Sequence, residues 1–426
     1  MTSPLNSQRT LGILVGGGPA PGINGVIAAA TIEAINSGLV VLGIYDGFKW
    51  LAKGDCDHIE RLQIHDVSRI YFSGGSILRS SRVNPIKSEA NITKTCESIR
   101  KLGLNYLITI GGDDTAFAAS QIARQLQNEI KIAHIPKTID NDLPLPKNIP
   151  TFGFETAKHV GAELVHNLME DARTTNRWYI IVSMGRKSGH LTLGIAKAAG
   201  AHLAIIGEQF SNSTISIHDV CDILEGAIIK RKAMGRDDGI VLIAEGVADK
   251  FSHEELKTIP GVIIEYDEYG NIHLSVIDLG KIIKLEIERR FAERGEKMKL
   301  VDIDLGYVLR SASPIAFDRE YTRDLGCAAV RFLVEREFKS HPSAMVSVDA
   351  GKIIPINFED IIDQATGKIQ VRMVDTGTES YAVAQKYMIR LNKSDFADKE
   401  QLSKLAKIAR MTTEQFTEKF GYLAGI

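Results

Sequence analysis

Hydrophobic residues occur in short runs separated by longer amphipathic stretches along the first 150 residues. Apolar runs at residues 11–15, 40–45, 106–110 and 130–135 predict buried strands. Between them, the stretches at 21–36, 88–102 and 116–127 predict helices. Strands that alternate with helices imply parallel crossovers, so we expect an α/β domain with a doubly wound, mainly parallel sheet.

The same alternation restarts after residue 152. Strands are predicted at 178–183, 203–206 and 239–244, and helices at 156–169, 191–199 and 218–232. We therefore expect a second α/β domain, with the proline-rich segment at 143–150 as the best candidate for the crossover. The charged tail at 394–426 is predicted to be helical, and its role is not readable from the sequence.

Composition bounds the class of protein. The chain has 426 residues, enough for two or more domains of roughly 100–200 residues. A formal net charge of −2 gives no reason to expect nucleic acid or an anionic membrane as partner. Four cysteines without CxxC spacing favour reduced thiols in a cytoplasmic protein. Neither a signal peptide nor an apolar run of about 18 residues is apparent.

Two polar segments directly follow predicted strands. Gly-Gly-Asp-Asp-Thr occupies 111–115, and Pro-Lys-Thr-Ile-Asp-Asn-Asp occupies 136–142. The carboxyl ends of strands are the usual position of a site in an open α/β sheet. Phosphoryl transfer needs acids for a divalent metal, a base for a hydroxyl and a cation for phosphate oxygens. The two segments supply these groups as Asp113, Asp114, Asp140, Asp142 and Lys137.

Each segment also has a plainer explanation. Residues 111–115 could form a solvated acidic start of a helix, with Asp113 or Asp114 as the N-cap. Residues 136–142 could form an Asx-rich turn. If this second segment is extended instead, alternate side chains point the same way, which would place Thr138, Asp140 and Asp142 on one surface.

A glycine-rich loop and several arginines could also handle phosphate. Residues 16–24, Gly-Gly-Gly-Pro-Ala-Pro-Gly-Ile-Asn, join the first strand to its helix, where backbone N–H groups can approach phosphate oxygens. The loop lacks both the dinucleotide fingerprint and the Walker A sequence, and a plain strand–helix turn stays open. Arginine grips phosphate bidentately, although each one alone is more often a surface ion pair. Those that follow or end strand-like segments are Arg82, Arg177, Arg186 and Arg310.

Taken in chain order, these motifs resemble the phosphofructokinase family from about residue 11 to 360. The matching segments are the glycine loop at 17–24, Gly-Ile-Tyr-Asp-Gly-Phe at 43–48, Ser-Arg at 81–82, Gly-Gly-Asp-Asp at 111–114, Thr-Ile-Asp-Asn-Asp at 138–142, Met-Gly-Arg at 184–186, Ala-Glu-Gly at 244–246 and Gly-Tyr-Val-Leu-Arg at 306–310. The resemblance implies two Rossmann-like α/β domains with the active site in the cleft between them. Residues 1–150 with about 309–360 would bind the phosphoryl donor, 151–308 would bind a sugar phosphate, and 361–426 would be a mostly helical extension.

The resemblance also assigns roles to single residues. Asp140 resembles the base that takes the proton of the sugar 1-hydroxyl, and Asp113 the acid of the Mg²⁺ site, with Asp142 close by. Gly18 resembles the glycine whose N–H meets the transferred phosphoryl group, and Arg82 lies with the donor. The implied sugar-phosphate residues are Thr138, Met184, Gly185, Arg186, Glu245, Tyr307 and Arg310, with Arg177 contributed by a neighbouring subunit of a homodimer or homotetramer.

Two positions bear on the phosphoryl donor. ATP-dependent members usually carry glycine where this chain has Asp114 and Lys137, and pyrophosphate-dependent members resemble this chain. A carboxylate at 114 would crowd and repel the α-phosphate of a nucleotide, and Lys137 would supply charge for a shorter donor. The implied activity is reversible, Mg²⁺-dependent transfer from pyrophosphate to fructose 6-phosphate, in glycolysis and gluconeogenesis.

Other readings stay open at this point. They are an ATP-dependent enzyme of the same class, a catalytically silent sugar-phosphate-binding subunit and a dinucleotide-binding oxidoreductase without its fingerprint. Pro19, Leu309 and the Ser-Ala pair at 311–312 depart from the common family pattern, so the fine sugar specificity stays open, and sedoheptulose 7-phosphate is an alternative substrate. Ala28 and Ile32 stand where regulated bacterial members carry effector-site arginines, so we expect no allosteric regulation.

Overall fold

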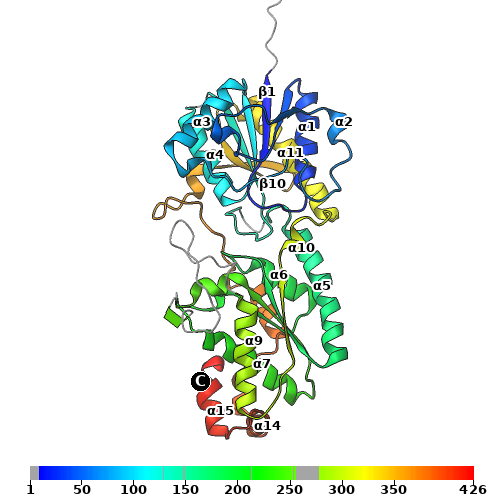
Figure 1. Cartoon of the computed structure of the whole chain (residues 1–426), viewed down its shortest axis with the longest axis vertical. Helices are drawn as coiled ribbons and strands as arrows, with labels where there is room; N and C mark the ends of the chain where they lie inside the picture. The colour runs from blue at the N-terminus through cyan, green and yellow to red at the C-terminus, as the bar shows by residue number, and fades with distance from the viewer. Residues whose placement is uncertain (1–8, 128, 147–148, 213, 253, 256–277) are drawn as a thin grey trace, which may run out of the picture. The chain divides into compact units, whose positions relative to one another are not determined.

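The chain forms two compact α/β units, each with its own sheet. A computed structural model describes residues 9–127, 129–146, 149–212, 214–252, 254–255 and 278–426. The first unit comprises Met1–Ala157 and Tyr307–Arg372, and the second comprises Lys158–Gly306 and Met373–Ile426. Figure 1 shows both in cartoon form. None of the described helices is both long and apolar enough to cross a membrane.

The first unit contains a seven-stranded sheet in the order β11-β10-β5-β4-β1-β2-β3. Neighbours from β10 to β2 pair in parallel, and the edge strands β11 and β3 are antiparallel. The expected mainly parallel sheet is therefore confirmed. The strands are β1 (Thr10–Val15), β2 (Val40–Ile44), β3 (Ile59–Arg61), β4 (Tyr106–Gly111), β5 (Lys131–Pro136), β10 (Ala344–Asp349) and β11 (Lys352–Asn357).

Helices cover both faces of this sheet (Figure 1). On one face lie α1 (Ile23–Asn36) and α11 (Ala316–Val334), and on the other α3 (Glu89–Lys101) and α4 (Asp113–Gln125). Strand β1 divides its side chains between two cores, because successive residues point to opposite faces: Leu11, Ile13 and Val15 join the α1–α11 core, and Leu14 joins the other.

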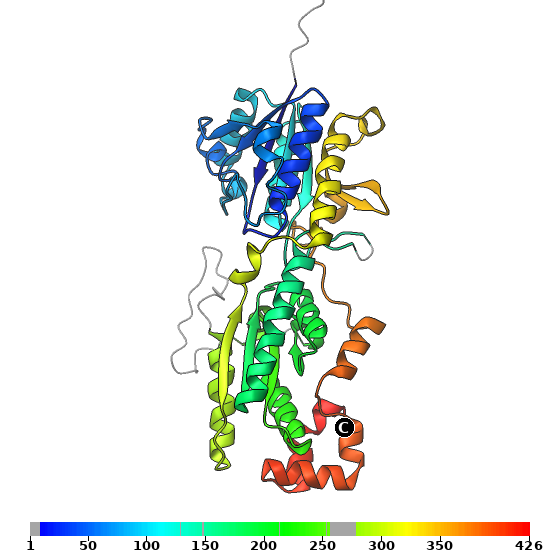
Figure 2. The same cartoon turned by 90° about the vertical axis from the view of Figure 1, so that its right-hand side faces the viewer.

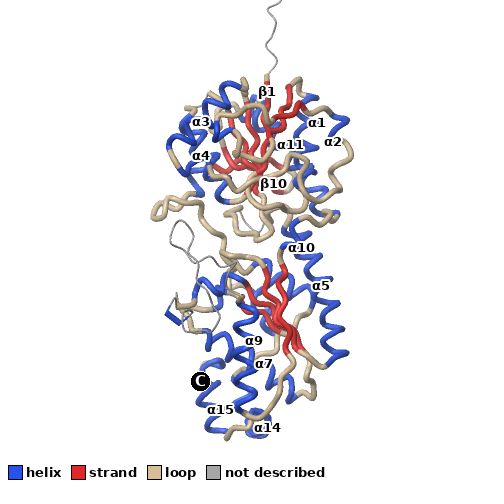
Figure 3. Tube along the Cα trace, viewed as in Figure 1, coloured by secondary structure: helices blue, strands red, loops and turns tan. Residues whose placement is uncertain are grey.

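The second unit has a four-stranded, fully parallel sheet in the order β7-β8-β6-β9, visible in Figure 3. Its strands are β6 (Trp178–Ser183), β7 (Leu203–Ile205), β8 (Gly239–Ala244) and β9 (Leu300–Leu305). Its long helices are α5 (Phe154–Thr175), α6 (His190–Ala199), α7 (Ile217–Ala233) and α9 (Leu279–Glu293). Trp178 requires a glycine opposite it, since a Cβ on Gly239 would lie 2.4 Å from the indole ring.

The tail is helical, as predicted, and packs within the second unit. It forms α12 (Glu379–Tyr387), α13 (Lys393–Ala397), α14 (Lys399–Ala409) and α15 (Thr413–Phe420). Figure 2 shows α14 and α15 as the red helices beside α7. Glu225 of α7, fully buried, accepts from Arg290 at 2.9 Å, from Lys419 of α15 at 2.9 Å and from Arg294. Burial alone would raise the pKa of Glu225, but Arg294 and Lys419 hold it below its ordinary value.

We expect Glu225→Gln to lower the free energy of unfolding by about 3 kcal/mol, because it removes the buried carboxylate that Arg294 and Lys419 share with Arg290, which keeps Asp222 and Glu286. Glu335→Gln is the matched control, since Glu335 makes an exposed pair with Arg331 and should contribute at most about 1 kcal/mol. Thermal denaturation of the three proteins measures the difference. Equal midpoints for both variants would contradict a stabilising role of the cluster.

Candidate active site

Three neighbouring strands of the first unit end in step, and a predicted motif follows each one. Val15 of β1 pairs with Ile110 of β4, and Gly111 pairs with Pro136 of β5. The strand order reverses between β1 and β4, which is the usual crevice for a ligand in such a sheet. The glycine loop, the acid pair and Lys137 therefore start side by side at one edge.

The acid pair occupies the first turn of α4. This helix begins at Asp113, three residues before the predicted start, with Gly112 as its N-cap. The plainer explanation required Asp113 or Asp114 to be the N-cap, and neither residue is. Acidic side chains are favoured in this position by the helix dipole. Both carboxylates line a cavity of about 220 Å³ at the strand ends.

Lys137 is a buried cation in the same cavity. Its side chain is 4% exposed, and its ammonium group donates to the carbonyl of Gly18. A Cβ on Gly17 would lie 3.6 Å from Nζ, so the lysine lies closely against the glycine loop. Burial lowers the pKa of Lys137 to about 8, and Arg310 acts in the same direction, whereas Asp140, Asp142 and Asp113 favour the charged form.

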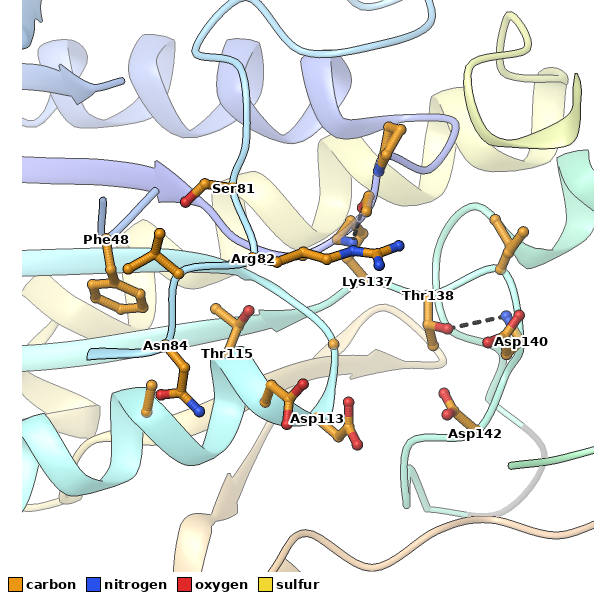
Figure 4. A pocket seen from close by; sticks show the side chains of 18 of the residues that line it. Phe48, Ser81, Arg82, Asn84, Asp113, Thr115, Lys137, Thr138, Asp140 and Asp142 are labelled. Atoms are coloured by element: carbon orange, nitrogen blue, oxygen red, sulfur yellow. Dashed lines mark hydrogen bonds between the residues drawn. The ribbon is translucent and has the colours of Figure 1, made fainter. Parts of the chain in front are cut away.

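The segment after β5 turns sharply. Asp140 donates its N–H to Thr138 Oγ1 at 3.0 Å, and Asn141 adopts the left-handed conformation with φ 56°. The segment is therefore not extended, and simple alternation does not explain how Thr138, Asp140 and Asp142 come together. The turn nevertheless brings all three to the cavity, as Figure 4 shows.

Two arginines complete the cationic side of the cavity. Gly17 donates its N–H to Ser81 O at 2.9 Å, which places Arg82 beside the glycine loop. A Cβ on Gly18 would lie 3.4 Å from Cζ of Arg310, so the absence of a side chain there leaves room for the guanidinium. Arg310 belongs to α10 (Tyr307–Arg310). Arg82, Lys137 and Arg310 thus line one cavity with the carboxylates. Figure 4 labels Arg82 and Lys137 there.

The second unit gathers a further set of predicted residues at its own strand ends. Ser183 of β6 pairs with Ala244 of β8 and Leu305 of β9, so Met184 and Glu245 follow neighbouring strands. Gly185 donates its N–H to Glu245 Oε1 at 3.3 Å. Arg186 Nε lies 3.6 Å from Asp249 Oδ2, and burial raises the pKa of Asp249.

Arg177 does not join these residues. It precedes β6, so the interpretation that it follows or ends a strand is wrong. The strand places Arg177 and Met184 at opposite ends, roughly 20 Å apart at about 3.3 Å per residue. Tyr307 belongs to the first unit, with a ring 5.0 Å from the guanidinium of Arg310 and a side chain that is 76% exposed.

Sequence reasoning missed His134, which supports the acid-bearing loop from β5. This fully buried residue has Nε2 3.1 Å from the carbonyl of Gly111 and Nδ1 2.9 Å from Thr109 Oγ1. A carbonyl only accepts, so Nε2 carries the proton and Nδ1 accepts from the hydroxyl. Burial lowers the pKa of His134 to about 3, which keeps the ring neutral. A histidine inside an apolar run was the available signal.

The chain belongs to the phosphofructokinase family. Residues 10–333, more than half of the chain, match the family described as Phosphofructokinase. A Thermotoga maritima protein named pyrophosphate–fructose 6-phosphate 1-phosphotransferase is 57% identical over 410 residues, covering 96% of this chain and 97% of that protein. A Naegleria fowleri protein of the same name is 47% identical, with 97% and 95% covered.

The solved structures agree on the fold. A pyrophosphate-dependent phosphofructokinase from Nitrosospira multiformis superposes with a TM-score of 0.63 at 17% identity, over 89% of this chain and 90% of that one. At this identity the likeness concerns the fold. The predicted family and the expected fold class are both confirmed.

We expect His134→Gln to reduce the loss of stability in acid. The unfolded chain binds a proton at His134 near pH 6.5 and the folded chain only near pH 3, so folding stability falls as pH drops below 6.5, by at most about 1.4 kcal/mol per pH unit. The melting temperature should therefore decrease more between pH 7.5 and pH 5 for the wild type than for the variant. Parallel decreases would contradict a neutral buried histidine.

Proposed function

We propose that this protein catalyses the reversible transfer of a phosphoryl group from pyrophosphate to D-fructose 6-phosphate, giving fructose 1,6-bisphosphate and phosphate. The observation that carries the proposal is the presence of Asp114 and Lys137 in one cavity with the glycine loop. The names of the relatives that are 57% and 47% identical support the same reaction.

The choice of donor follows from charge and space. Asp114, in the first turn of α4, adds a carboxylate that repels the α-phosphate of a nucleotide. Lys137 adds a cation at the glycine loop, where its ammonium group donates to the carbonyl of Gly18. This positive charge would bind a donor shorter than a nucleotide. A cavity of about 220 Å³ lies below the roughly 300–1,000 Å³ of pockets that hold drug-sized ligands, which suits a compact donor.

Asp140 is proposed as the base that accepts the proton of the sugar 1-hydroxyl as its oxygen attacks the phosphorus in line. Lys137, Arg82 and Arg310 line the same cavity and would stabilise the charge on the transferred group and on the leaving phosphate. The N–H of Gly18 would point to the same group, as expected for a glycine loop at a strand end.

A magnesium ion fits these residues only together with the substrate. The part of the chain that the structure describes holds no cluster of three or more His, Cys, Asp or Glu side chains able to form a complete metal site. Mg²⁺ usually binds through one or two carboxylates plus substrate phosphates. Asp113, with Asp142 lining the same cavity, would hold it. When bound, the ion would neutralise negative charge on the pyrophosphate.

The sugar phosphate is proposed to bind mainly to the second unit. Gly185, Glu245 and Arg186 meet at the ends of β6 and β8, where carboxylate and guanidinium groups suit hydroxyls and a phosphate. The remaining proposed contacts are Thr138, Met184, Tyr307 and Arg310. The first unit would accordingly bind the donor.

Arg177 is proposed to act across a subunit boundary in a homodimer or homotetramer. Its position at the amino end of β6, opposite Met184, supports a role outside its own subunit's strand-end cluster. A cytoplasmic location and flux in both glycolysis and gluconeogenesis stay part of the proposal.

Initial rates with fructose 6-phosphate, Mg²⁺ and either pyrophosphate or ATP test the function. We expect turnover with pyrophosphate and little with ATP. Asp140→Asn should lower kcat by about 10²–10⁴-fold, since general-base catalysis contributes that much, and leave KM for fructose 6-phosphate near normal. Exposed Asp57 offers the control Asp57→Asn, which should leave both constants unchanged. Substantial turnover by Asp140→Asn would rule out Asp140 as the base.

We expect the double variant Asp114→Gly, Lys137→Gly to acquire ATP-dependent activity and to lose most pyrophosphate-dependent activity. Removing the carboxylate frees space for the α-phosphate, and removing the ammonium takes away the cation proposed for the shorter donor. The two single variants serve as controls, because each should show a smaller change in the ratio of kcat/KM for the two donors. A double variant that still uses pyrophosphate alone would contradict the donor assignment.

A further inference from the structure

Arg372 holds the turn that carries Asp140 and Asp142, although it lies 231 residues after Asn141. All three of its guanidinium nitrogens donate to the segment that follows β5. Nε reaches the carbonyl of Asn141 at 3.0 Å, Nη1 reaches the carbonyl of Ile149 at 2.7 Å, and Nη2 donates to Asn141 Oδ1. The backbone N–H of Arg372 also donates to the carbonyl of Asp142 at 2.8 Å.

These bonds converge on the one strained residue of the turn. Asn141 has φ 56°, a left-handed conformation that non-glycine residues adopt at a cost, asparagine at a smaller one. Its side chain also accepts from the N–H of Thr151 at 3.0 Å. Arg372 and Thr151 therefore fix both the carbonyl and the side-chain oxygen of the residue between the two aspartates.

The position of Arg372 separates this task from substrate binding. Arg372 is not among the residues that line the donor cavity, whereas Thr138, Asp140 and Asp142 are. Burial lowers the pKa of the Arg372 guanidinium, and the nearby Asp142 carboxylate favours its charged form. The arginine thus supports the turn from outside the cavity.

We propose that Arg372 is a positioning residue for the transfer reaction, which sets the orientation of the Asp140 carboxylate by holding the Asn141 turn. This inference rests on the proposed function of Asp140. Arg372 lies outside residues 10–333, which are the part of the chain that matches the family. It is the last residue of the first unit before the chain continues into the second. No motif identified in the sequence includes Arg372.

Kinetics of Arg372→Ala and Arg372→Lys test the proposal. A lysine has one nitrogen and cannot reach three acceptors, so we expect kcat to fall about 10–100-fold for Arg372→Lys and further for Arg372→Ala, with KM for pyrophosphate within about threefold of the wild type. Low millimolar guanidinium should partly restore kcat of Arg372→Ala. Arg331→Ala, which removes an exposed guanidinium of the same unit, should keep wild-type rates. Unchanged kcat in Arg372→Ala would overturn the proposal.

Hydrogen exchange makes the result independent of the assigned reaction. In Arg372→Ala, amides of the non-proline residues in 138–145 should exchange at least tenfold faster, while those of α15 in the second unit keep wild-type rates. Faster exchange throughout the chain would indicate general destabilisation and overturn the specific role. If the wild-type protein fails to use pyrophosphate but the local exchange difference persists, the proposed function fails while the anchoring by Arg372 stands. If the variant shows no local exchange difference, the anchoring itself is overturned.

Discussion

The register of β1, β4 and β5 is the constraint on which the rest of the donor site depends. Because Val15, Ile110 and Gly111 pair with their neighbours in a continuous parallel ladder, the three strands end at one level. The segment after each strand contributes a different chemical group: backbone N–H groups after β1, carboxylates after β4 and an ammonium group after β5. A shift of one residue in one strand would turn its side chains to the opposite face and dissolve the cluster.

Burying Lys137 requires that the surrounding groups compensate its charge. Desolvation disfavours the ammonium, as its lowered pKa reflects, and the carboxylates of Asp140, Asp142 and Asp113 oppose that effect. His134, held neutral near the end of β5, adds no positive charge to those of Lys137, Arg82 and Arg310. The carboxylates therefore partly compensate the burial of the ammonium group.

Local pattern predicted the buried strands up to residue 244 well, but it missed the buried strand β10 and the core helix α11 later in the chain. Strands β1, β4, β5, β6 and β8 are buried runs of six residues, long and apolar enough to be recognised. The edge strands β3 and β11 contain no fully buried residue and were not predicted either. Helix α4 begins three residues before its predicted start, because Gly112 and the two acids suit the first turn of a helix. From the sequence, these residues were interpreted as a polar segment after a strand.

The sequence by itself determined which chemical groups are present, the central strands that carry them, and the family. Only the tertiary structure decided that Lys137 is buried, which nitrogen of His134 carries the proton, that Asn141 interrupts the extended segment, and that Arg372 holds it there. The physical reason is range: periodicity records whether a residue faces a core, whereas a bond across 231 residues exists only once both segments occupy the same space.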